Sequence, residues 1–81
     1  MRVIYDASVD AAYIYLTDEI EPGAVQQTFP CEPENIRGSV NLDFDAAGRL
    51  LGLEILNASV VLPGEALSKA KANSREPIGK R

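Results

Sequence analysis

The stretch that decides the fold is SVNLDFDAAGRLLGLEIL, residues 39–56. Apolar and polar residues alternate on both sides of a central DAAG, and the apolar positions of matching parity are Val40, Leu42, Phe44, Leu51, Leu53 and Ile55. Period-two alternation on either side of a turn signal is typical of a β-hairpin with one face buried. Residues 39–56 therefore predict a pair of antiparallel strands.

The hairpin register follows from matching the apolar faces, because a slip of one residue would turn every side chain to the other face. Pairing 44 with 49, 42 with 51 and 40 with 53 satisfies this rule and leaves Asp45–Gly48 as the loop. Gly48 supplies a positive φ, and the Asp45 side chain can accept a backbone hydrogen bond from two residues on. In this register Glu54 is expected opposite Ser39.

The same stretch imitates a calcium loop, since Asp43, Asp45, Gly48 and Glu54 have the spacing of EF-hand positions. Ala47, however, stands where a third oxygen ligand is needed. The expected register also puts Glu54 on the order of 13 Å from Asp43 along the ladder, too far for one ion. We therefore interpret the stretch as a turn. A weak metal or small-ligand site that uses Asp43, Asp45 and Glu54 remains an alternative.

A second hairpin is expected near the N-terminus, where residues 2–6 and 11–17 are rich in β-branched and aromatic side chains. Asp6 and Asp10 bound the turn between them, and we interpret both as turn-capping residues. A carboxylate pair for acid–base chemistry is the alternative. It requires burial that raises one pKa, which a sequence does not reveal.

The remaining chain predicts one linking strand and one helix. Residues 24–29 alternate loosely and indicate a strand, whereas the prolines in residues 30–35 favour a loop. A short helix is expected at 63–72, because Pro63 suits a first helical turn and Lys69 suits a last one. Asn57 is a candidate cap for a short turn before it.

These elements define an α+β fold. We expect an antiparallel β-sheet of two hairpins plus the linking strand, about five strands in meander-like order, with one short C-terminal helix packing on the sheet. Residues 1–72 are expected to form a single small domain, followed by a flexible basic tail at 73–81.

Composition restricts the function. The chain has 81 residues and a net charge of −4; residues 1–67 carry eleven acidic and three basic side chains, a net −8, and residues 68–81 carry five basic and one acidic, a net +4. An acidic body argues against nucleic acid as partner. The absence of histidine removes Ser-His and Cys-His dyads and most zinc sites. The single cysteine, with no apolar stretch of membrane-spanning length, favours a reducing, cytoplasmic location and no membrane partner.

In two stretches, YDASVDAAYIYL (5–16) and VNLDFDAAGRLLGLEILNAS (40–59), the chain resembles the bacterial family called Domain of Unknown Function 2283. The matching positions are Tyr5, Asp6, Asp10, Tyr13, Asp43, Asp45, Gly48, Gly52, Glu54, Ile55, Ala58 and Ser59. The resemblance covers about residues 3–62 and implies a small α+β domain with an antiparallel sheet. It implies no catalytic residues, and members noted beside toxin-like reading frames suggest an antitoxin-like role.

Three functions remain open, and we favour a non-enzymatic interaction module without a cofactor, either homodimeric or bound to a small protein partner. Apolar residues on both faces of residues 50–56 motivate this hypothesis and make Leu50 and Leu56 the candidate interface. An antitoxin-like binder and a metal or small-ligand binder are the alternatives. Asp6, Asp10, Asp43, Asp45, Gly48 and Glu54 are the candidate turn or partner-contact residues.

Overall fold

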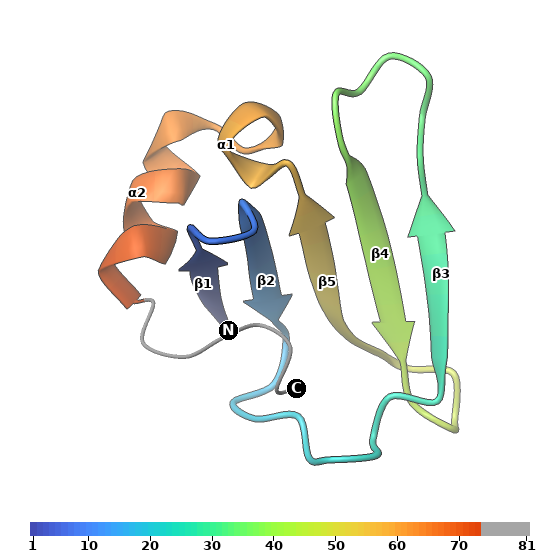
Figure 1. Cartoon of the computed structure of the whole chain (residues 1–81). Coiled ribbons are helices and arrows are strands. Elements are labelled where there is room, and N and C mark those ends of the chain that lie inside the picture. Colours follow the sequence, from blue (N-terminus) through green and yellow to red (C-terminus); the bar gives the residue numbers. More distant parts are fainter. Residues whose placement is uncertain (74–81) are drawn as a thin grey trace.

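Both expected hairpins form. In the computed structural model, which describes residues 1–73, five antiparallel strands and two helices make an α+β fold, as predicted (Figure 1). The strands are β1 (Arg2–Asp6), β2 (Ala11–Tyr15), β3 (Gln27–Cys31), β4 (Ser39–Phe44) and β5 (Leu50–Leu56). The helices are α1 (Ala58–Val61) and α2 (Gly64–Asn73). Within this described part, neither helix has the length and apolar character needed to cross a membrane.

The strand order differs from the expected meander. It is β1-β2-β5-β4-β3, because the connection after β2 runs along one end of the sheet to the far edge before β3 begins (Figure 1). This order resembles a Greek key. β2 and β5 contain more buried residues than the other strands, and pairing them places both near the centre of the sheet, where both faces can be covered.

The register of the β4–β5 hairpin is shifted by two residues from the predicted one. Leu42 pairs with Leu53, and Glu54 pairs with Asn41 instead of Ser39. The apolar faces still match, because a shift of two preserves side-chain parity. The shift has a local cause: the pairing skips Leu51 in a β-bulge, so that Phe44 meets Leu50, and Arg49 stays in the loop.

The third strand also differs from prediction, since β3 spans Gln27–Cys31 and includes Pro30, which was expected in a loop. A proline interrupts a central strand but is tolerated at a sheet edge, where one side of the strand needs no partner. β3 is such an edge, and every one of its residues is exposed. The prediction of a loop at Pro30 was wrong because local sequence does not reveal whether a strand lies at the edge of a sheet or in its centre.

Both helices lie on one face of the sheet, which we call the helical face, on the side of β1 and β2 (Figure 1). Its core joins Ala12 of β2, Ile55 of β5 and Ala58 of α1. On the opposite face, Ile4, Tyr13 and Tyr15 form a second core cluster, against which Ile20 of the β2–β3 connection packs.

The C-terminal helix confirms the predicted one, with bounds one residue later at each end. Asn73, expected in the tail, is its last residue. The rest of the predicted basic tail, residues 74–81, lies outside the described residues.

Candidate functional site

The buried carboxyl group of Asp43 is the centre of the most specific polar arrangement in the described chain. Asp43, predicted as a turn or partner-contact residue, has no exposed surface and lies within β4. Tyr13 donates its hydroxyl to Asp43 Oδ2 at 2.7 Å, and Thr28 donates its hydroxyl to Oδ1 at 2.7 Å. Three strands, β2, β3 and β4, thus meet at one carboxyl group on the face opposite the helices. Burial of a polar group is tolerated when it is hydrogen-bonded in this way.

Gly52 makes room for this contact. A Cβ added at Gly52 would lie 2.6 Å from both Cε1 and the hydroxyl oxygen of Tyr13. Gly52 is directly opposite Asp43 in the β4–β5 pairing, so the Tyr13 ring crosses β5 at its only glycine. Glycine is therefore needed at this position, because it lets the Tyr13 ring approach the backbone of β5 closely.

Glu54 lies on the same face as Asp43, and its Oε1 accepts a hydrogen bond from Asn41 Nδ2 at 3.1 Å. Asn41 is its direct cross-strand partner. The observed register places Glu54 two residues from Asp43 along the ladder, about 7 Å at the usual rise. This spacing is shorter than the one expected from the predicted register, so distance alone does not exclude an ion shared by these two carboxylates.

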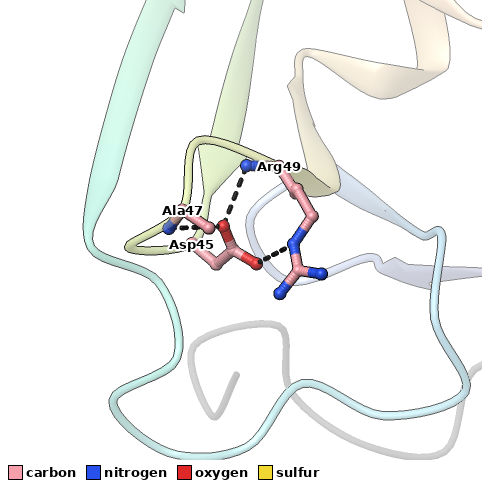
Figure 2. A network of polar contacts seen from close by, with 3 residues as sticks. All are labelled: Asp45, Ala47 and Arg49. Carbon is pink, nitrogen blue, oxygen red and sulfur yellow. Dashed lines mark hydrogen bonds and ion pairs between the residues drawn. The ribbon is translucent and has the colours of Figure 1, made fainter.

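Asp45 does not join the other two carboxylates. Its Oδ1 accepts from the backbone N–H groups of Ala47, at 2.9 Å, and Arg49, at 2.8 Å, and its Oδ2 pairs with Arg49 Nε at 3.0 Å (Figure 2). Gly48 has the expected positive φ of 79°. The backbone N–H of Arg49 holds the pKa of Asp45 below its ordinary value, with further help from the Arg49 guanidinium and the Ala47 N–H.

These contacts support the turn interpretation of the calcium-like motif. In residues 1–73, no group of three or more acidic or cysteine side chains has the arrangement to hold a metal ion. The predicted metal alternative, which needs Asp43, Asp45 and Glu54 together, gains no support from this geometry.

Asp10 connects the first hairpin to α1. Its Oδ1 accepts from the Ser59 backbone N–H at 3.0 Å and from the Tyr5 hydroxyl at 2.7 Å, and its Oδ2 accepts from the Ser59 hydroxyl at 2.7 Å. The Ser59 hydroxyl and then the Tyr5 hydroxyl lower the pKa of Asp10, and the same bond to Asp10 raises the pKa of Tyr5.

Asp10 thereby takes the capping role predicted for Asn57. Asn57 adopts a left-handed conformation, makes no side-chain cap, and instead donates its side-chain amide to the Arg37 carbonyl. Because Asp10 is far from α1 in the sequence, no local sequence pattern indicates that it caps this helix. Asp6, the other carboxylate of the hairpin turn, accepts from the backbone and hydroxyl of Ser8 as a local turn residue.

The two predicted interface residues, Leu50 and Leu56, do not lie on the same face of the sheet. Leu50 pairs with Phe44, whereas Leu56 pairs with Ser39, an odd number of residues away on β4, so the two leucines point to opposite faces. Leu50 belongs to a set that we call the open apolar face: Phe29, Leu42, Phe44, Leu50 and Leu53. Leu56 belongs to the end of the sheet at which α1 begins.

The open apolar face occupies the half of the helical face that the helices do not reach. The main helix contacts are with β1, β2 and β5. Val40 of β4 packs against the core cluster that includes Ala58 of α1, whereas the rest of β4 and all of β3 lie farther from the helices (Figure 1). Phe29 is 51% exposed and packs edge-to-face on Phe44, with ring centroids 5.6 Å apart. Sequence reasoning missed Phe29 and Thr28, because neither shows its role until β3 is placed beside β4.

Two recesses on the surface of the described residues lie near these elements. One, of about 500 Å³, opens beside the β4–β5 turn and is lined by Gln26, Gln27 and residues 45–48. The other, of about 240 Å³, lies between Val3 and α2. The first contains a single carboxylate, Asp45, whose oxygens already hold the turn.

Comparison with known proteins agrees with the sequence resemblance. The model of the family described as "Protein of unknown function (DUF2283)" matches residues 2–59, so the chain belongs to this family. Neither the curated proteins nor the solved structures contain a match to this chain.

Proposed function

We propose that this chain, as a member of the DUF2283 family, is a non-enzymatic protein-interaction module that forms a homodimer through the open apolar face. The observation that carries the proposal is the half-covered helical face. One half of it is packed under α1 and α2, while the other half presents Phe29, Leu42 and Phe44 beyond the reach of the helices.

The chemistry of the open apolar face suits a second copy of the same chain. Its five residues are all apolar and none is charged. A flat apolar sheet packs well on another such sheet at about 10 Å. A chain of this size buries a limited core by itself, so association would add burial that the monomer lacks.

Association through this face is favoured over pairing of sheet edges. The β1 edge lies beside α2, which packs against that strand. The β3 edge contains Pro30, whose missing N–H weakens any added strand. Both edges are therefore poorly suited to extend the sheet into a second molecule.

A catalytic function has less support from the described side chains. Asp6, Asp10 and Asp45 hold turns or the cap, while Asp43 and Glu54 accept bonds from neighbouring strands. We propose a cytoplasmic location, which the single Cys31 favours.

Native mass spectrometry and light scattering after size exclusion, from ~1 µM to ~1 mM, test the proposal over the range of weak to moderate dimer affinities. We expect a dimer at the upper concentrations for the unaltered chain. Phe29→Ser should shift the equilibrium to monomer, since Phe29 is an exposed member of the face. Val9→Ser, in the β1–β2 turn, removes an exposed side chain outside that face and is the matched control.

A monomer at every concentration would contradict the proposal, as would a dimer equally stable in both variants. A complex with a different small protein from the host, without a homodimer, would favour the hetero-partner or antitoxin-like alternative instead.

A further inference from the structure

A second surface lies at the end of the sheet where α1 begins. Six large hydrophobic side chains of the described chain are exposed, and three of them belong to segments that meet at α1. We call these three the end platform: Val9, Ile36 and Val60, with exposed fractions of 65, 43 and 52%. They come from the β1–β2 turn, the β3–β4 loop and α1, which gather at one end of the sheet (Figure 1). Leu56, at the same end, points to the face opposite the helices and is not part of the platform.

Hydrogen bonds fix the platform segments to one another. The β1–β2 turn is held to α1 by Asp10, whose carbonyl accepts from the Ala58 N–H at 2.9 Å and whose side chain accepts from Ser59. The β3–β4 loop is held to the same place by the bond from the Asn57 side chain to the Arg37 carbonyl.

Close packing adds to this attachment, because a Cβ on Gly38 would lie 2.7 Å from Val61 Cγ2. The exposed apolar side chains thus stand on segments that are fixed in place. A preorganised surface loses less conformational entropy on binding than a mobile loop does. Exposed apolar groups on such neighbouring segments are typical of a protein-binding site.

The charge around the platform is acidic. Its segments carry Asp6, Asp10, Glu32 and Glu34 against one cation, Arg37. Lys71 of α2 lies nearby, 5.7 Å from the centre of the Tyr5 ring. Asp10 is ionised at neutral pH, and the hydrogen bonds from the Ser59 and Tyr5 hydroxyls lower its pKa further.

We propose that the end platform binds a protein segment that combines apolar anchor residues with basic side chains. Two features of the platform carry this inference: three exposed apolar groups on fixed segments, and a surplus of carboxylates around them. A second copy of the chain would bring the same acidic groups and be repelled, as would an anionic membrane or nucleic acid. The inference is independent of the homodimer, because the open apolar face and the end platform share no residue.

The test uses the full chain, labelled with ¹⁵N, and two synthetic amphipathic helical peptides as probes. The first peptide has a leucine stripe and lysine on its other face; in the second, each lysine is replaced by glutamate. We expect the basic peptide to shift the amide signals of the platform segments, and the acidic peptide to leave them unchanged. Val60→Ser combined with Ile36→Ser should weaken binding of the basic peptide at least ~10-fold, as expected for loss of anchor contacts.

Phe29→Ser is the matched control and should bind the basic peptide as the unaltered chain does. Amide spectra of each variant show whether the fold is retained. Binding of both peptides alike, binding that maps to the open apolar face, or full affinity in the folded double variant would each overturn the proposal. Failure of the homodimer in the experiment above would leave this result unaffected.

Discussion

At the scale of single residues, the acidic side chains that suggested a site have structural tasks. Asp10 caps α1 from another hairpin, Asp45 closes its own turn, and Asp43 joins three strands through Tyr13 and Thr28. Their exposure to solvent also differs: Asp43 has no exposed surface, whereas Asp45 lies in the β4–β5 loop and is partly exposed. The same residue type therefore holds a helix end, a turn or three strands according to its position.

Gly52→Ala tests the space that the Tyr13 ring occupies. The added methyl would meet the ring at 2.6 Å, which forces the ring or the backbone of β5 to move. We expect the free energy of unfolding to fall by about 1–3 kcal/mol, the usual cost of overpacking. Urea denaturation measures the change. Gly64→Ala, at the start of α2 with open space around its Cβ, is the control and should be nearly neutral; equal effects would exclude our explanation.

Asp10 should make stability depend on pH. Its pKa in the folded protein is below the ordinary value of 3.8, so its contribution is fully present above that value and is lost as the pH falls through the folded pKa. Asp10→Asn should therefore be less stable than the unaltered chain at pH 6, and the difference should shrink below about pH 4.

Urea midpoints measured from pH 2 to pH 6 check this dependence, with exposed Asp18→Asn as the control. A difference between the Asp10 variant and the unaltered chain that does not change with pH would show that the carboxylate charge is unimportant for the cap.

At the scale of elements, the bulge in β5 determines the β4–β5 turn, and β3 forms one edge of the sheet. The bulge at Leu51 keeps Arg49 in the turn, where Asp45 holds it, and the carbonyl of Leu51 accepts from the Leu16 N–H of the neighbouring segment at 3.0 Å. β3, in contrast, is an edge strand that contains Pro30, a residue without the backbone N–H that an added strand could bind.

Pro30→Val tests this protective role. Valine supplies the missing N–H and has a high strand propensity, so the β3 edge should pair with other molecules more readily. We expect larger, concentration-dependent assemblies beyond the dimer, measured by light scattering and thioflavin fluorescence. An unchanged size distribution would mean that Pro30 has no part in limiting assembly.

At the scale of the whole molecule, charge should affect the two proposed surfaces in opposite ways. Residues 1–67 carry a net charge of −8, so two copies repel one another while a basic partner is attracted. Salt screens both effects over a Debye length of about 8 Å at physiological ionic strength.

We therefore expect added salt to strengthen the homodimer and to weaken binding of the basic peptide. Dimer formation should also raise the thermal midpoint with protein concentration, because only the folded chain associates. Calorimetry and sedimentation at low and high salt measure these trends. If salt changed both affinities in the same direction, the proposal that the end platform binds through its acidic groups and the open apolar face through apolar contacts would be wrong.

The sequence by itself determined the strands of both hairpins, the C-terminal helix, the Asp45–Gly48 turn and the α+β class. These features depend on residues close together in the chain: alternation, a glycine with positive φ and helix-terminal charges. Local patterns record them directly.

Only the tertiary structure decided the strand order, the register of β4 on β5, the cap from Asp10 and the burial of Asp43. Each depends on contacts between residues far apart in the chain. The candidate surfaces belong to this second group, because the open apolar face exists only where β3 lies beside β4 and away from the helices, and the end platform only where three separate segments meet. A pattern within one strand specifies which residues share a face, but the rest of the fold determines what covers that face.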